Sequence, residues 1–267
     1  ESEEAAASRD LYLIGLGLAA VILLLVVIGL IQNKKKSRQL AEQNELINSK
    51  NKEIGLAYAE IKEKNKDITD SIKYAKRIQS AILPPRKLVK EYLTQSFVLY
   101  KPKDIVAGDF YWLEHRDNKV LFAACDCTGH GVPGAMVSVI CNNGLNRSVR
   151  EHGLTDPGQI LDKTREIVMS EFEKSEEEVK DGMDVALCSL DGNRLQYAGA
   201  NNPLWIIRKG DSEVEEIKAD KQPIGAFEYR KDFTNHTIQL EEGDCIYMFT
   251  DGYADQFGGE RGKKLKY

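Results

Sequence analysis

An apolar run lies near the start of the chain, at residues 11–31, and contains no charged or strongly polar side chain. At about 1.5 Å rise per residue, a helix of this length spans roughly 30 Å, the thickness of a bilayer's hydrocarbon core. A cleaved signal peptide has a shorter apolar run with its positive charge in front. Here the positive charges follow, at residues 34–36 and 38. We therefore expect a single transmembrane helix, with residues 1–10 outside the cytoplasm and everything after residue 33 inside it. The alternative is a buried core helix.

The next stretch, residues 33–83, is polar, favours helix and has a seven-residue apolar repeat. The repeat places the following residues at one heptad position: Leu40, Ile47, Ile54, Ile61 and Ile68. Several of the paired core positions hold Asn, which lowers coiled-coil stability but fixes register. The pattern predicts a coiled-coil signalling helix that forms a parallel homodimer. The alternative is a static spacer with a solvated, charged surface.

Composition excludes some classes of protein. The formal net charge of -5 argues against a nucleic-acid-binding protein, which is usually basic, so we expect no nucleic acid as partner. The five cysteines are an odd number, and most lie in apolar stretches, so we expect buried, reduced thiols. The spacing of Cys125 and Cys127 does not fit a zinc knuckle.

The character of the sequence changes after Pro84-Pro85, which ends the helix because proline lacks the N–H that a helix needs. From residue 86 onward, short apolar runs separated by turns predict strands at 96–100, 110–113, 120–125, 185–190, 195–198, 204–208, 237–240 and 245–249. Two consecutive helices are predicted at residues 134–151 and 157–173, the second capped by Asp156. Mostly antiparallel strands interrupted by two helices predict an α+β layered sandwich.

Three short motifs each place an aspartate at a strand end beside glycine. They contain Asp109 in Val-Ala-Gly-Asp-Phe, Asp126 in Ala-Cys-Asp-Cys-Thr-Gly-His-Gly, and Asp251 in Phe-Thr-Asp-Gly. Three carboxylates that converged without a cation would repel one another, and a hard divalent ion with oxygen ligands would relieve that repulsion. A single Asp-Gly is usually only a turn; the three together favour a metal site.

These motifs, together with residues 77–84 (Arg-Ile-Gln-Ser-Ala-Ile-Leu-Pro) and 198–203 (Ala-Gly-Ala-Asn-Asn-Pro), resemble the PPM-type metal-dependent protein phosphatases, in particular their SpoIIE/RsbU-like bacterial branch. The resemblance covers about residues 72–257. It implies a layered α-β-β-α sandwich of antiparallel sheets at residues 86–267, in a protein of the bacterial cytoplasmic membrane. The family has a further metal-binding aspartate near its end, before a final strand. The chain stops at Tyr267, so we expect this domain to be incomplete at its C-terminus.

The resemblance also implies two Mn²⁺ or Mg²⁺ ions. Asp126 would bridge the ions, the Cys127 carbonyl would be a backbone ligand, and Asp109 and Asp251 would bind from either side. Asp126 and Asp109 are thus the expected catalytic residues, and attack by hydroxide on a phosphoserine or phosphothreonine is the implied reaction. Asp184 is either a further metal ligand or a surface acid before a strand. His130, four residues after Asp126, is either a general acid or a residue that shapes the turn.

The expected function is a membrane-anchored serine/threonine protein phosphatase controlled by an upstream sensor through the coiled coil. The implied substrate is a phosphorylated regulatory protein of the anti-sigma-antagonist type. The alternative is a catalytically dead PPM-like scaffold or partner-binding module. A sensor histidine kinase is excluded because none of the four histidines lies within residues 33–82.

Overall fold

A computed structural model describes residues 2–174, 180–255, 257–258 and 263–264. It divides the chain into two compact units, Glu1–Ile68 and Thr69–Tyr267. The boundary lies inside one helix, so the last turns of that helix belong to the second unit.

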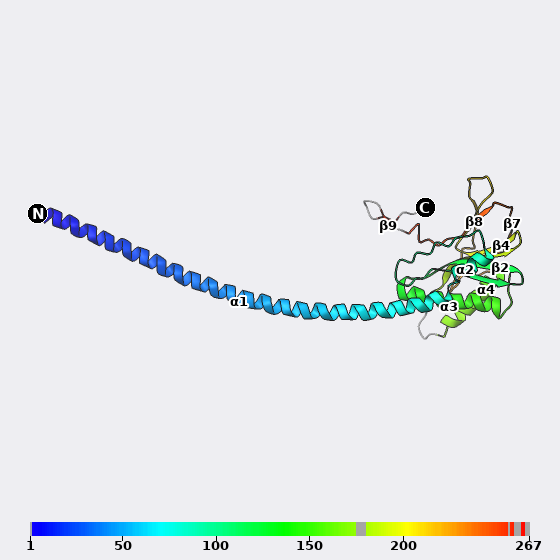
Figure 1. Ribbon diagram of the computed structural model, residues 1–267, viewed down its shortest axis with the longest axis horizontal. Coiled ribbons are helices and arrows are strands. Elements are labelled where there is room, and N and C mark those ends of the chain that lie inside the picture. The colour runs from blue at the N-terminus through cyan, green and yellow to red at the C-terminus, as the bar shows by residue number, and fades with distance from the viewer. Residues whose placement is uncertain (1, 175–179, 256, 259–262, 265–267) are drawn as a thin grey trace. The chain divides into compact units, whose positions relative to one another are not determined.

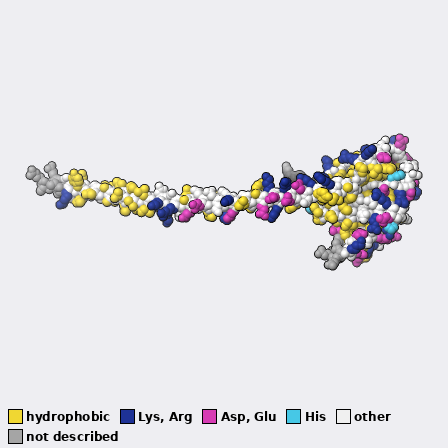
Figure 2. Space-filling model, turned by 60° about the horizontal axis from the view of Figure 1, so that its bottom comes forward, with side chains coloured by type: hydrophobic (Ala, Val, Ile, Leu, Met, Phe, Trp, Pro, Cys, Tyr) yellow, Lys and Arg dark blue, Asp and Glu magenta, His cyan; other side chains and the backbone are white. Residues whose placement is uncertain are grey.

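Helix α1 runs without a break from Ser2 to Ile82 (Figure 1). Its length follows from a sequence without proline up to residue 83, and Pro84-Pro85 stops it as predicted. Hydrophobic side chains gather along its N-terminal part and give way to charged ones, as Figure 2 shows. Among the described residues this is the one helix that is long and apolar enough to cross a membrane.

The predicted coiled-coil face of α1 is exposed in the single chain. Ile47, Ile54 and Ile61 are 54%, 64% and 58% exposed, respectively. Surface ion pairs one turn apart, such as Lys64 with Glu60 at 2.7 Å, add modest helix support. The coiled coil and its homodimer stay predictions.

The second unit is built on a five-stranded antiparallel sheet in the order β1-β2-β3-β4-β7. Its strands are β1 (Phe110–Arg116), β2 (Lys119–Cys127), β3 (Met183–Asp191), β4 (Arg194–Ala200) and β7 (His236–Gln239). Between β2 and β3 the chain forms α3 (Gly131–Arg150) and α4 (Pro157–Phe172). The predicted cap of α4 is confirmed, because Asp156 accepts a hydrogen bond from the backbone N–H of Gln159.

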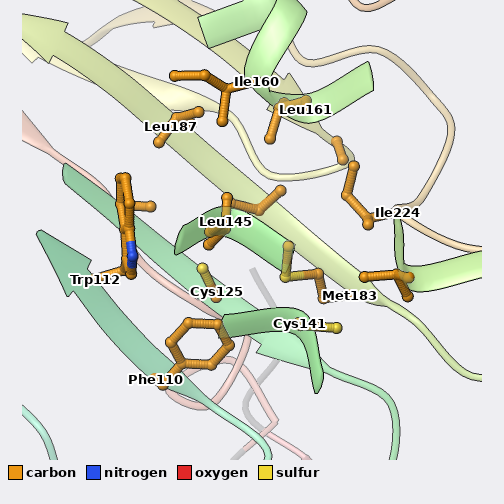
Figure 3. Close-up of a cluster of buried hydrophobic side chains, with 14 of the residues drawn as sticks. Phe110, Trp112, Cys125, Cys141, Leu145, Ile160, Leu161, Met183, Leu187 and Ile224 are labelled. Atoms are coloured by element: carbon orange, nitrogen blue, oxygen red, sulfur yellow. The ribbon is translucent and has the colours of Figure 1, made fainter. Parts of the chain in front are cut away.

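Two hydrophobic clusters lie on the two faces of this sheet. The first joins α3 and α4 to one face through residues such as Phe110, Trp112, Leu145 and Leu161 (Figure 3). The second covers the other face with α2 (Arg86–Tyr92) and a three-stranded sheet in the order β6-β5-β8. The strands of that sheet are β5 (Leu204–Ile207), β6 (Glu215–Ile217) and β8 (Cys245–Tyr247), and a short pair follows, β9 (Phe257–Gly258) with β10 (Lys263–Lys264). The predicted α+β class with antiparallel sheets is confirmed.

Two local predictions were wrong, and two short elements were not predicted. Residues 96–100 alternate in burial as a strand would, but the segment joins no ladder in the part of the chain that the structure describes. Helix α2 and strand β6 were not predicted, because each is too short to show a period. Four of the five cysteines are buried free thiols as predicted, but Cys245 is exposed on edge strand β8.

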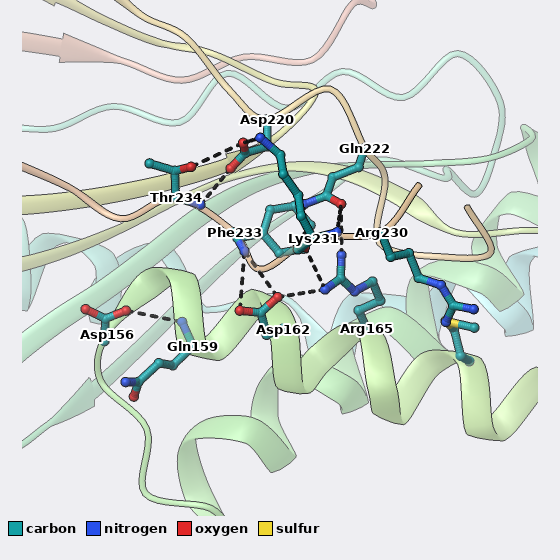
Figure 4. Close-up of polar contacts among 11 residues, drawn as sticks. Asp156, Gln159, Asp162, Arg165, Asp220, Gln222, Arg230, Lys231, Phe233 and Thr234 are labelled. Atoms are coloured by element: carbon teal, nitrogen blue, oxygen red, sulfur yellow. Dashed lines mark hydrogen bonds and ion pairs between the residues drawn. The ribbon is translucent and has the colours of Figure 1, made fainter. Parts of the chain in front are cut away.

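The loop between β6 and β7 is tied to α4 through a buried arginine (Figure 4). Arg165 donates to Asp162 at 2.8 Å, to the Gln222 side chain at 3.1 Å and to the Lys231 carbonyl at 3.0 Å. Its guanidinium also lies 4.7 Å from the centre of the Phe233 ring. These bonds fix the loop whose Ile224 pairs with Met183, the first residue of β3.

Candidate functional site

Two of the candidate acids lie opposite each other on neighbouring strands. Asp126, near the end of β2, pairs in register with Asp184, near the start of β3. The segments that extend β2 and β3 past these aspartates stay hydrogen-bonded, because the Thr128 N–H donates to the Gly182 carbonyl at 3.0 Å. The Gly182 N–H donates in turn to the Thr128 hydroxyl at 3.1 Å. The structure thus brings Asp126 and Asp184 to one end of the sheet.

Asp109 lies at this end of the sheet because the backbone before it passes close to the turn after β2. It precedes β1, whose Phe110 pairs with Cys125 of β2. A Cβ atom on Gly108 would lie 2.6 Å from the Gly129 carbonyl oxygen and 2.9 Å from that of Cys127, so only glycine fits there. The glycine before Asp109 therefore allows that carboxylate to lie beside the turn that follows Asp126.

The third motif meets the first two through hydrogen bonds. The Thr250 hydroxyl donates to Asp109 Oδ2 at 2.8 Å, and the Asp251 N–H lies 3.4 Å from Asp126 Oδ2 as its donor. Asp251 itself is exposed, whereas Asp109, Asp126 and Asp184 are half-buried. All four candidate aspartates therefore gather around the end of β2.

The site is electrostatically strained by its own acids. Burial, together with the Asp109 and Asp251 carboxylates, raises the pKa of Asp126 to about 8. Burial also raises the pKa of Asp184; the Asp251 charge acts in the same direction, and a hydrogen bond from Asn201 opposes it. Such a group of acids favours bound protons or bound cations.

The donor set fits a hard divalent cation. Over the described residues, no three His, Cys, Asp or Glu side chains form a ready-made metal cage. The gathered side chains are nevertheless carboxylates, and the Cys127 carbonyl oxygen lies close to Gly108, the residue before Asp109. Oxygen ligands of these kinds are the ones that Mg²⁺ and Mn²⁺ prefer. The gathering of these carboxylates at the end of β2 is the observation that carries the fit, because a cation would relieve the repulsion that helps to raise the pKa of Asp126.

His130 lies apart from these hydrogen bonds. Its Nδ1 atom is 3.3 Å from Asp104 Oδ2, and its side chain is 79% exposed. It is the residue before α3, with extended backbone geometry and no side-chain hydrogen bond that caps this helix, and both of its expected roles stay predictions.

Besides Thr250, two residues that matter for the site's geometry were missed from the sequence. Gln79, in the last turn of α1, is buried, donates to the Ala107 carbonyl and accepts from the Ala107 N–H at 3.2 Å. Asn201 donates to Asp184 Oδ1 at 2.8 Å. Both residues lie in segments that carried the family resemblance, which was the only signal available for them.

A family model comparison matches residues 116–266, more than half of the chain, to the stage II sporulation protein E (SpoIIE) family. The chain belongs to the SpoIIE family. Its similarity to a solved relative agrees: the SiaA-PP2C domain of Pseudomonas aeruginosa is 34% identical, with a TM-score of 0.66, over 76% of this chain and 79% of that one. Membership makes this SpoIIE-family chain a metal-dependent serine/threonine protein phosphatase, a hydrolase.

Two further solved structures are similar at lower TM-scores. The PP2C phosphatase domain of SpoIIE from Bacillus subtilis, with a fragment of its regulatory domain, is 22% identical, with a TM-score of 0.46, over 57% of this chain and 43% of that one. The RsbU and RsbW domains of Rv1364c from Mycobacterium tuberculosis are 20% identical, with a TM-score of 0.46, over 58% of this chain and 42% of that one. The comparison with curated proteins found no match.

Proposed function

We propose that Asp109, Asp126 and Asp251, with the Cys127 carbonyl, hold two Mn²⁺ or Mg²⁺ ions, and that Asp184 is a further ligand. The observation that carries this is the central place of Asp126, whose carboxyl group accepts a hydrogen bond from the Asp251 N–H and whose pKa is raised by the nearby Asp109 and Asp251 carboxylates. A bridging ligand needs such a place, because it must face the ligands of both ions.

The chemistry follows from this arrangement of acids. When bound, two divalent ions activate water at neutral pH and offset the charge on a phosphoryl group. The protein's own contribution is to orient the carboxylates from rigid strand ends, with Thr250 fixing Asp109. The half-buried setting of Asp126 strengthens its electrostatic interactions relative to those in open water. The proposed reaction is hydrolysis of a phosphoserine or phosphothreonine on a protein.

We infer that the protein is anchored in the bacterial cytoplasmic membrane by residues 11–31. The support is an exposed apolar stretch of α1 followed at once by Lys34, Lys35, Lys36 and Arg38. Positive charge on that side favours a cytoplasmic location for the phosphatase unit. A phosphorylated regulatory protein of the anti-sigma-antagonist type is the proposed substrate, on the strength of the family resemblance.

Control through the coiled coil is supported by how the end of α1 is bonded within the second unit. Gln79 is bonded to Ala107, two residues before Asp109, and donates to the Ser138 hydroxyl of α3 at 2.9 Å. Directly after the helix, the Pro84 carbonyl accepts from the Tyr111 hydroxyl at 3.1 Å. A shift or rotation of this helix would therefore be transmitted to the segment before β1, where Asp109 lies.

The proposal is tested by Mn²⁺ binding and phosphate release in the detergent-solubilised protein. We expect calorimetry to show Mn²⁺ binding that Asp126→Asn abolishes, and phosphate release from phosphorylated casein that requires Mn²⁺. Asn118→Gly, in the β1–β2 turn, is the control and should leave both unchanged. Equal Mn²⁺ binding by wild type and Asp126→Asn would contradict the proposed ligand set.

A further inference from the structure

The turn after β4 holds Asn201 in the left-handed region of backbone space, with φ of 56°. Few residues other than glycine adopt this conformation, and asparagine is among those that tolerate it best. The Asn201 side chain is directed at the site, because its Nδ2 donates to Asp184 Oδ1 at 2.8 Å. An ionised carboxylate only accepts hydrogen bonds, so the amide must present its nitrogen there. A residue of unusual backbone conformation thus contacts a candidate metal ligand.

The turn is fixed by several bonds besides this one. The Asn201 N–H donates to the Asp220 carbonyl at 2.9 Å, and the Asp220 N–H donates to the Gly199 carbonyl at 3.0 Å. The Tyr197 hydroxyl donates to the Asn202 carbonyl at 2.6 Å. A Cβ atom on Gly199 would overlap that hydroxyl, so glycine is required for the turn to close. The position of the Asn201 amide is therefore set by its surroundings.

The position of the Asn201 amide determines the orientation of the Asp184 carboxylate. Asp184 lies at the start of β3, opposite Asp126, and Asn201 occupies its Oδ1 atom. A carboxylate has two oxygens and rotates freely when nothing holds it. With Oδ1 bonded to a rigid turn, the side chain is fixed and Oδ2 keeps its capacity to bind a cation. Outer-shell partners of this kind commonly tune metal affinity by about 10- to 100-fold.

We propose that Asn201 is a positioning residue that orients Asp184 toward a divalent ion bound beside Asp126. The inference rests on the proposed function, since it assigns a role to Asn201 within that metal site. It predicts that loss of the amide weakens metal binding without disturbing the fold, because the backbone bonds of the turn do not use the side chain.

Asn201→Gly tests this, and Asn118→Gly is a matched control. Both asparagines have a left-handed backbone, with φ of 56° and 60°, so glycine suits both positions and removes an amide from each. We expect Asn201→Gly to weaken Mn²⁺ binding about 10-fold or more by calorimetry on the detergent-solubilised protein. Asn118→Gly should bind within about twofold of wild type, the scatter expected for a site remote from the metal. Raising Mn²⁺ should restore phosphate release by Asn201→Gly.

A second pair of variants distinguishes an effect of Asn201 that acts through Asp184 from a general structural effect. Asp184→Asn should weaken Mn²⁺ binding by a similar factor, and adding Asn201→Gly to it should cause no further loss. The inference is overturned if Asn201→Gly binds Mn²⁺ like Asn118→Gly, or if its effect persists undiminished beside Asp184→Asn. Absence of Mn²⁺ binding by the wild-type protein would instead overturn the proposed function itself.

Discussion

The Thr250 hydroxyl donates a 2.8 Å hydrogen bond to Asp109 Oδ2, although the two residues are 141 positions apart in the sequence. The bond connects the motif before β1 with the motif after β8. It occupies one oxygen of a candidate metal ligand and fixes its orientation. Thr250 thus does for Asp109 what Asn201 does for Asp184, and the site holds two of its acids through neutral donors.

Removing the Thr250 hydroxyl should weaken metal binding. Thr250→Val keeps the shape of the side chain but cannot donate to Asp109, so we expect Mn²⁺ affinity to fall by about 10-fold. Thr250→Ser, which retains a hydroxyl, should lose much less. Calorimetric titration of both variants with Mn²⁺ gives the comparison, and equal affinities for Val and Ser would show that the hydroxyl does not support the site.

The stability of the metal-free protein should depend on pH through Asp126. Its pKa rises from an ordinary value of 3.8 to about 8 in the folded protein, so the folded state binds more protons than the unfolded state between these values. The contribution of this group to the free energy of unfolding is therefore fully present below about pH 4 and is lost as pH rises toward 8. Between these values the free energy of unfolding falls by less than about 1.4 kcal/mol per pH unit.

Thermal unfolding in EDTA from pH 5 to 9, followed by tryptophan fluorescence, measures this effect. Both tryptophans, Trp112 and Trp205, lie in the second unit, so the signal reports the phosphatase fold. We expect the Tm of wild type to fall with rising pH more steeply than that of Asp126→Asn. Saturating Mn²⁺ should flatten the wild-type curve. Parallel curves for the two metal-free proteins would refute the assignment.

Cutting the bonds of Gln79 should destabilise the second unit. Gln79→Ala leaves the Ala107 N–H and carbonyl without their partner in buried surroundings, which costs about 1–3 kcal/mol of unfolding free energy. Ser80→Ala, at the exposed neighbouring position, should change it by less than about 0.5 kcal/mol. Urea unfolding followed by tryptophan fluorescence compares them, and a Gln79 variant as stable as the Ser80 variant would remove the support for control through this helix.

The predicted dimer depends on the apolar face of the heptads. Ile54→Glu places a charge at a core position of each helix, so the two chains should separate. Lys52→Glu changes charge two residues away but stays outside the core, and it should leave the dimer intact. Light scattering of the detergent-solubilised protein gives the mass of each. A monomeric wild type, or a dimer that survives Ile54→Glu, would contradict the coiled coil.

The sequence predicted the fold class because its main elements have clear periods or turns. Residues 120–125 and 185–190 are apolar runs that became the centres of β2 and β3, and Asp156-Pro157 marked the start of α4. The segment 96–100 has the right alternation but pairs with no strand among the residues that the structure describes, and no local pattern reveals this. Helix α2 was missed since its seven residues give fewer than two full turns.

In the candidate site, too, some residues were predicted from the sequence and others were not. The aspartates stood out because each follows or precedes a strand next to glycine, and the structure gathers them at the end of β2. Their outer partners, Thr250 and Asn201, could not be assigned from spacing, because each contact crosses from one motif to another. The end of α1 is a similar case: the heptads predict a helix through Gln79, but its bonds to Ala107 arise only in the folded unit.

The central claim is that the acids around Asp126 make a metal-dependent protein phosphatase site. Phosphate release from a phosphoserine protein, measured with and without Mn²⁺ for wild type and Asp126→Asn, tests it most directly. We expect release that depends on Mn²⁺ in the wild type and is lost in the variant. A folded wild-type protein with a complete phosphatase domain that releases no phosphate with Mn²⁺ or Mg²⁺ would contradict it and favour a scaffold that has kept the fold without the activity.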